Sequence, residues 1–159
     1  MIKIQLPFLA LMLLLNCQDG PKAAFNEEFV KASPNKELPF ENLIGEYHLD
    51  VDSKIRYNIN STDTLRLIVK KDSTFVALNY VDYKTDSLQL KKFEGKLLYT
   101  NKFKESFLNF RSKGIDFNGG GGIEIYYRKK DSIIVLYVYT PPLKGQENGD
   151  YLRYIKMKD

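Results

Sequence analysis

Residues 65–81 read Leu-Arg-Leu-Ile-Val-Lys-Lys-Asp-Ser-Thr-Phe-Val-Ala-Leu-Asn-Tyr-Val, and this stretch decides the fold class. Apolar side chains recur at every second position of 65–69, a period of two that is typical of a half-buried strand. Residues 72–73 are Asp and Ser, which favour turns because their side chains bond nearby backbone groups. Residues 74–81 are nearly all β-formers. The stretch therefore predicts two strands joined by a tight turn.

The tetrapeptide Lys-Lys-Asp-Ser occurs at 70–73 and again at 129–132, each time between two strand-like runs. We interpret this as two similar hairpins and not as a repeat fold. Residues 83–90 are mixed in character and receive no assignment. Short strands joined by tight turns, about eight in all, predict an all-β sandwich or an antiparallel up-and-down β-barrel; the barrel is our assignment. The remaining strands are expected at 44–49, 95–100, 107–110, 123–128, 132–140 and 150–158.

The first sixteen residues have the pattern of a secretion signal. Lys3 gives a basic start, and an apolar run follows over 4–15. A run of this length after a basic start is typical of a signal peptide. It is shorter than the roughly 20 apolar residues that a membrane-spanning helix requires. Asn16 and Cys17 then end the run.

Leu14-Leu15-Asn16-Cys17 resembles the lipobox of bacterial lipoproteins, although that family usually has Gly, Ala or Ser where Asn16 stands. The resemblance implies that Cys17 is the first residue of the mature protein and carries acyl chains. Several acyl chains give stable anchoring, whereas one is marginal. Gln18 follows in place of Asp, which in this family implies anchoring in the outer membrane of a Gram-negative bacterium. The alternative is an ordinary secretion signal with an incidental Cys.

Three segments follow from these patterns: a signal peptide over 1–16, a lipidated Cys and tether over 17–38, and a β-barrel domain over 39–159. Gly and Pro near the start of the tether oppose regular structure. Within it, residues 23–32 are expected to form a short helix.

The segment Gly45-Glu46-Tyr47 resembles the Gly-x-Trp motif that opens lipocalin-like domains, with Tyr in place of Trp. Residues 71–75, Lys-Asp-Ser-Thr-Phe, resemble a hairpin of small exported lipocalin-like lipoproteins. The resemblance implies an eight-stranded up-and-down barrel that holds a small apolar ligand or is filled by its own side chains. In lipocalins a late Arg packs over the Trp, so Arg153 is expected to stack on Tyr47 as a cation on an aromatic face.

Residues 133–139 are apolar on both faces of the expected strand. In a barrel, one face then points inside and the other is covered by the N-terminal segment or by a partner. Tyr126, Tyr137 and Tyr139 are the candidate cavity or interface aromatics, and core packing is the alternative. Together with Tyr47 and Arg153 they form the predicted ligand-binding set.

The sequence offers no recognisable catalytic or metal-binding motif. His48 is the only His, and Cys17 is the only Cys. Zinc sites use several such ligands at defined spacing, so neither a metal nor a cofactor is expected. His48 is expected at the surface. The acidic residues that could be invoked for catalysis are expected to be solvated: Glu46, Asp50, Asp116 and Glu124. The Gly run over 119–122 precedes a strand, whereas a phosphate loop precedes a helix, so a hairpin loop is expected there.

Removing residues 1–16 removes only Lys3, which leaves 23 basic against 20 acidic residues and a net charge of +3. The charges are interspersed, so nucleic-acid binding is not expected. Lys pairs beside turns predict a solvated rim, with weak attraction to anionic surfaces left open. The sequence thus predicts a lipid-anchored binding module of the cell envelope, holding a small apolar ligand, and not an enzyme. The alternative is a protein-interaction lipoprotein of inhibitor or immunity type with a filled barrel.

Overall fold

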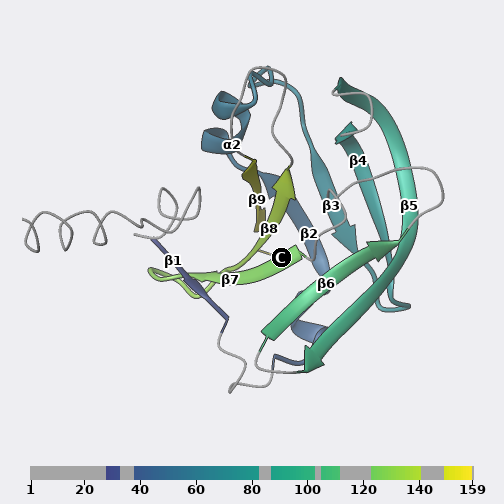
Figure 1. The fold of residues 1–159 in the computed structure, drawn as a ribbon, viewed down its shortest axis with the longest axis vertical. Helices are drawn as coiled ribbons and strands as arrows, with labels where there is room; N and C mark the ends of the chain where they lie inside the picture. Colours follow the sequence, from purple (N-terminus) through teal and green to yellow (C-terminus); the bar gives the residue numbers. More distant parts are fainter. Residues whose placement is uncertain are drawn as a thin grey trace, which may run out of the picture.

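The computed structural model describes residues 28–32, 38–82, 87–102, 105–111, 123–140 and 149–158, and within them it forms a closed antiparallel barrel of eight strands (Figure 1). The predicted fold class is confirmed. The elements in chain order are β1 (Phe29–Lys31), the 3₁₀ turn η2 (Phe40–Leu43), β2 (Gly45–Leu49), α2 (Val51–Arg56), β3 (Arg66–Val69), β4 (Thr74–Asp82), β5 (Ser87–Lys102), β6 (Glu105–Arg111), β7 (Ile123–Arg128), β8 (Ile134–Thr140) and β9 (Asp150–Lys156).

The barrel closes because consecutive strands from β2 to β9 pair as neighbours and β9 pairs back with β2. Strand β1 lies outside this ring of eight. On its β7 side, strand β6 pairs with the first two residues of β7, Ile123 and Glu124. Strand β1 pairs with Tyr126, Tyr127 and Arg128 on β7, which leaves β7 bonded to β8 on its other edge. The N-terminal strand thus continues the edge pairing of β7 where β6 stops.

Both Lys-Lys-Asp-Ser segments form the predicted hairpin turns. Residues 70–73 connect β3 to β4, and residues 129–132 connect β7 to β8. The last residue of each turn has left-handed backbone, with φ of 57° at Ser73 and 55° at Ser132. In the first turn, Asp72 accepts hydrogen bonds from the Thr74 backbone and hydroxyl at 3.2 and 2.6 Å. The two identical sequences therefore both form hairpin turns, but the first closes with a bond from Lys70 N–H to the Thr74 carbonyl and the second, one residue longer, with a bond from Arg128 N–H to the Ile133 carbonyl.

Strand β8 has the two buried faces that the sequence predicts. Ile134, Leu136 and Val138 belong to the cluster inside the barrel. Val135, Tyr137 and the partly buried Tyr139 belong to a second cluster on the outer face, together with Phe29 of β1 and Tyr126 and Tyr151. The N-terminal segment thus covers part of the outer face, which was one of the two expected arrangements.

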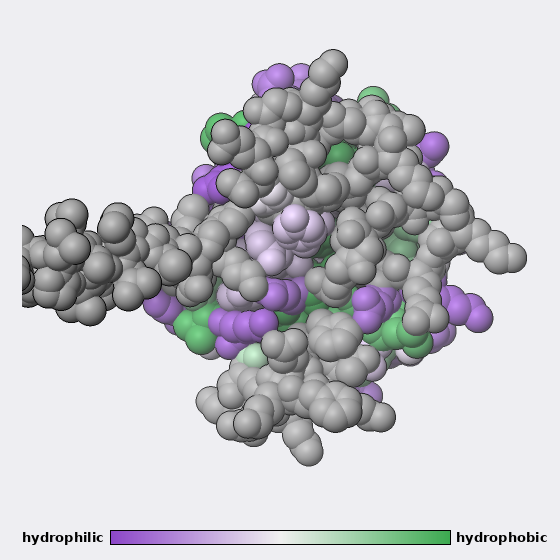
Figure 2. Space-filling view, viewed as in Figure 1, coloured by the Kyte–Doolittle hydropathy of each residue, from purple (hydrophilic) through white to green (hydrophobic). Residues whose placement is uncertain are grey.

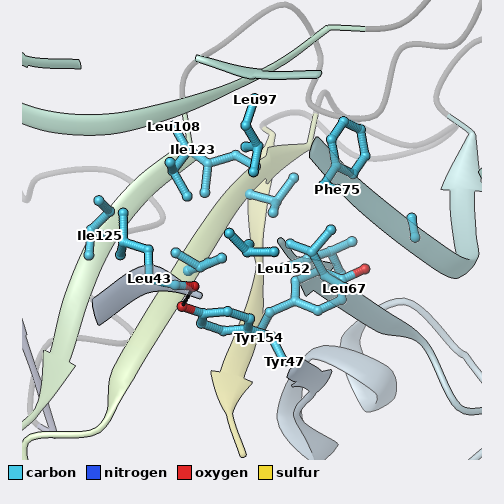
Figure 3. Close-up of a cluster of buried hydrophobic side chains, with 14 of the residues drawn as sticks. Leu43, Tyr47, Leu67, Phe75, Leu97, Leu108, Ile123, Ile125, Leu152 and Tyr154 are labelled. Atoms are coloured by element: carbon cyan, nitrogen blue, oxygen red, sulfur yellow. Dashed lines mark hydrogen bonds between the residues drawn. The ribbon is translucent and has the colours of Figure 1, made fainter. Parts of the chain in front are cut away.

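Strand β2 begins at Gly45, the first residue of the Gly-x-Tyr motif. Gly45 has a φ of 141°, a conformation that L side chains rarely adopt. A Cβ there would lie 2.7 Å from Cε of Lys156. Two residues later, Tyr47 is fully buried and its hydroxyl donates a 2.7 Å hydrogen bond to the Leu43 carbonyl of η2 (Figure 3). The motif therefore sets the start of β2 and fastens it to the preceding turn.

One local prediction is wrong. A helix was expected over 23–32, but residues 29–31 form strand β1, where backbone bonds to β7 replace helical ones. Helix α2, Val51–Arg56, follows β2 in a segment to which no element was assigned. The strand expected at 95–100 lies inside a longer one, β5, which begins at Ser87. Local preference is a weak guide in short segments because tertiary pairing overrides it.

Candidate functional site

Arg153 stacks on a ring, but the ring is Phe29 and not Tyr47. Its guanidinium carbon lies 4.4 Å from the centre of the Phe29 ring. Successive side chains of a strand point to opposite faces, and on β9 the side chains of Leu152 and Tyr154 point inward. Arg153 therefore faces outward, whereas Tyr47 belongs to the interior cluster. The expected Arg153–Tyr47 contact is thus wrong, although a cation–aromatic contact is present.

Arg153 also forms a buried ion pair with Asp50, whose side chain is 8% exposed. The prediction that Asp50 is solvated is therefore wrong. Asp50 is the N-cap of α2, where its Oδ1 accepts a 2.9 Å bond from the Ser53 backbone. The buried Ser53 hydroxyl accepts a 2.9 Å bond from the Arg153 backbone. Burial opposes the charge on Arg153, but the attraction and hydrogen bond of Asp50 together with those of Tyr137 outweigh it and raise the pKa of the guanidinium. This network fastens α2 to β9.

The predicted tyrosines gather on the outer face beside Arg153. Tyr126 and Tyr137 lie ring to ring at 4.1 Å between centroids, and Phe29 meets Tyr137 edge-on at 6.0 Å. Tyr139 and Tyr151 extend the row at 5.5 Å. Burial raises the pKa of Tyr137 to about 12, against the opposing hydrogen bond of Arg153. Tyr126 and Tyr137 are buried and Tyr139 only partly so. The structure thus brings Tyr126, Tyr137, Tyr139 and Arg153 together, and it leaves Tyr47 apart from them.

The described interior is densely packed. Twelve large side chains of the barrel expose less than 2% of their area, and ten of the interior residues are labelled in Figure 3. A side chain that lined a water-sized cavity would expose area to it. Tyr47 is among the twelve, and burial raises the pKa of its hydroxyl far above the usual range. These side chains therefore pack against one another and do not line a void. They are Leu43, Tyr47, Leu65, Leu67, Phe75, Tyr80, Leu108, Ile123, Ile125, Leu136, Leu152 and Tyr154.

Helix α2 exposes two large apolar side chains. Val51 is 67% exposed and Ile55 is 72% exposed. Residues four apart lie on the same side of a helix, so the two form one apolar surface, which we call the α2 pair. Isolated exposed apolar residues are normal, whereas adjoining ones on a rigid element are a feature of interaction sites.

A pocket of about 490 Å³ lies at the opposite end of the barrel. The strands show that it is opposite, because β2 runs from Gly45 at this end to Asp50 at the start of α2. The pocket combines apolar and charged walls, and its lining residues are Glu41, Asn42, Tyr127, Ser132, Ile133, Ile134, Lys156, Met157 and Lys158.

His48 lies on the barrel wall and is partly exposed, as expected. Its ring nitrogen is 2.5 Å from a carboxylate oxygen of Glu46, which also accepts a 3.3 Å bond from Arg66. The hydrogen bond to His48 is the main reason why the pKa of Glu46 is lowered. His48 and Glu46 are each 36% exposed, and neither lines the 490 Å³ pocket.

Several predicted features lie outside the described residues: Cys17, Asp116 and the Gly run at 119–122. Among the residues that are described, no group of three His, Cys, Asp or Glu could hold a metal ion. Within the same ranges, no helix is both long and apolar enough to cross a bilayer. Ligand binding by Tyr47, Tyr126, Tyr137, Tyr139 and Arg153 stays a prediction.

No family model, curated protein or solved structure matches the chain.

Sequence reasoning missed Phe29, Asp50 and the α2 pair. For Asp50 a signal was present, because Asp before a turn with Asp52 early and Arg56 late is typical of a capped helix. For Phe29 no local signal exists, since its role depends on pairing with a strand about 100 residues later in the chain.

Proposed function

We propose that this protein is a lipid-anchored binding module of the bacterial cell envelope, attached to the outer membrane through Cys17. Of its two possible forms, we propose the one that binds a protein partner with its surface. The observation that carries this choice is the packing of the described interior. A carrier barrel keeps space for its ligand, whereas large side chains from Tyr47, Phe75 and Leu136 meet inside this one with less than 2% exposure.

The α2 pair is the surface that we propose for the partner. A binding surface needs apolar side chains that are exposed before binding and held in a fixed geometry. Val51 and Ile55 are exposed. Their helix is held by the Asp50 cap and by the buried Arg153 and Ser53 beneath it. Arginine often dominates the energy of an interface, but Arg153 is buried here. In this proposal Arg153 supports the helix and does not contact the partner.

The test is photo-crosslinking in the native cells with a photoreactive amino acid at one position of the full chain. The reporter replaces Ile55, which is 72% exposed on α2. The matched control replaces Leu90, which is equally apolar and 69% exposed, but on β5. We expect a discrete protein adduct from position 55 that position 90 does not give. Val51→Asp with the reporter at 55 is expected to abolish the adduct, because it places a charge in the apolar contact.

The same adducts at positions 55 and 90, or adducts at neither, would refute the proposed surface. An additional Cys17→Ser variant separates anchoring from binding. If it releases the protein from the membrane and still gives the adduct when partner and protein share a compartment, the two roles are independent.

A further inference from the structure

The N-terminal chain joins the barrel at one particular end. The Glu28 carbonyl accepts a 2.8 Å hydrogen bond from the backbone of Lys129, in the turn between β7 and β8. Glu28 is only 11 positions after Cys17 in the chain, and an extended chain of that length spans at most about 40 Å. An anchor at Cys17 therefore holds this end of the barrel near the bilayer, with α2 at the far end.

The same end carries an excess of positive charge. Lys129, Lys130 and Lys158 are exposed, and Lys156 is partly exposed at the rim of the pocket. Asp131 is already neutralised by Arg128, with which it makes bonds of 2.9 and 2.7 Å. Lys158 lies close enough to Asp131 to lower the pKa of that carboxyl, so the C-terminal lysines and the turn form one surface. Glu28, bonded through its carbonyl to Lys129, and Glu41, in the pocket wall, are acidic residues beside the four lysines.

Apolar side chains lie among these lysines. Met157 is 46% exposed, and it lines the 490 Å³ pocket with Ile133 and Ile134. Lysine side chains around an apolar hollow suit the boundary between lipid headgroups and acyl chains, because the charges meet phosphates while the apolar groups enter the interface. We call Lys129, Lys130, Lys156, Met157 and Lys158 the basic end.

We propose that the basic end docks on the anionic headgroups of the membrane that holds the lipid anchor. This inference rests on the proposed anchoring at Cys17 and adds an orientation to it. The barrel stands on its basic end and presents the α2 pair away from the bilayer. Two contacts, the acyl chains and the basic end, then fix the barrel instead of leaving it free on a tether.

The test uses the mature lipoprotein reconstituted into vesicles of phosphatidylcholine, with or without phosphatidylglycerol. Because Cys17 is the only Cys and is consumed by its lipid, an introduced thiol is the sole labelling site. Three exposed serines serve as reporters for a fluorophore: Ser132→Cys at the basic end, Ser73→Cys in the β3–β4 turn at the same end of the barrel, and Ser61→Cys beyond α2 at the opposite end. Ser132 and Ser73 each follow Lys-Lys-Asp, and both have a positive φ. Lipids with a nitroxide on the headgroup quench any label that is close to the surface.

With phosphatidylglycerol present, we expect quenching at positions 132 and 73, which lie at the same end of the barrel, and little at 61. Each lysine near an anionic membrane surface strengthens binding to that surface about fivefold. Lys129→Glu with Lys130→Glu is therefore expected to reduce quenching at 132 to the level at 61. The control pair Lys91→Glu with Lys92→Glu, two exposed lysines within strand β5 on the wall of the barrel, should leave it within about twofold. Lys158→Glu provides a second, independent variant with a smaller loss.

Equal quenching at positions 132 and 61, or quenching at 132 that is the same without phosphatidylglycerol, would overturn the docking surface. Equal losses from the two lysine pairs would also overturn it, because net charge and not this surface would then be responsible. Protein that fails to float with the vesicles would instead refute the anchor, and the orientation with it.

Discussion

The Asp50–Arg153 pair allows a stability prediction that separates an ion pair from a helix cap. Asp50→Ser removes the carboxylate, but Ser is also a good N-cap residue, so the roughly 1 kcal/mol of capping is largely kept. Arg153, with a side chain 7% exposed, then keeps Asp52 as a carboxylate partner, which is 2.7 Å away and 68% exposed. Breaking a buried pair costs about 3–5 kcal/mol. Because Asp52 still compensates in part, we expect Asp50→Ser to lower the free energy of unfolding by about 3 kcal/mol.

The assay is equilibrium unfolding in urea, followed by circular dichroism, on the mature chain. Asp52→Ser is the matched control, since it removes a carboxylate from the same Arg at an exposed position. We expect it to cost less than about 1 kcal/mol. Replacing both members of a buried pair with apolar groups is often nearly neutral. The double variant Asp50→Ser with Arg153→Met should therefore be more stable than the sum of the single changes predicts.

Two results would refute this reasoning. The first is a loss for Asp50→Ser that equals the loss for Asp52→Ser. The second is additivity of Asp50→Ser and Arg153→Met within about 0.5 kcal/mol, which is the behaviour of independent sites.

Three further predictions follow from single contacts. Tyr47→Phe leaves the buried Leu43 carbonyl without the 2.7 Å bond and should cost about 1–2 kcal/mol in urea unfolding; no change would mean that the bond is dispensable. Gly45→Ala should lower the free energy of unfolding by about 1–3 kcal/mol. Adding Lys156→Ala should relieve the clash with the lysine side chain but not the backbone strain at φ 141°, so full recovery of stability would contradict this account. Arg128 holds the pKa of Asp131 down to about 2, below its usual value near 3.9, so the stability it contributes is present above pH 4 and lost as the pH falls toward 2. Asp131→Asn should remove this loss from an acid titration, and an unchanged titration would exclude Asp131 as its source.

The barrel could be predicted from the sequence because its strands are joined locally. Alternation over 65–69, the two Lys-Lys-Asp-Ser turns and the doubly apolar strand at 133–139 each record a nearby pairing or a burial pattern. The same reasoning failed where the partner is distant. Nothing near residue 29 in sequence indicates that it pairs with Arg128, so a helix was expected where β1 forms.

The candidate site was predicted in part for the same reason. Tyr137 and Tyr139 share a face of one strand, which the period of two reveals. The partner of Arg153 depended on which face of β9 it occupies, and the lipocalin-like resemblance suggested Tyr47 inside the barrel instead of Phe29 outside it. In Figure 2, the described surface mixes hydrophilic and apolar residues, in agreement with charges that are interspersed along the sequence. The basic end became visible only when the turn at 129–132 and the C-terminal lysines were brought together.

The most direct test of the central claim is native mass spectrometry of the protein extracted in detergent from its own membrane. We predict the mass of residues 17–159 plus the acyl chains on Cys17, with no further small molecule that is lost on denaturation. Such a molecule would contradict a filled barrel and indicate a ligand carrier, and a chain without acyl groups would contradict the lipid anchor.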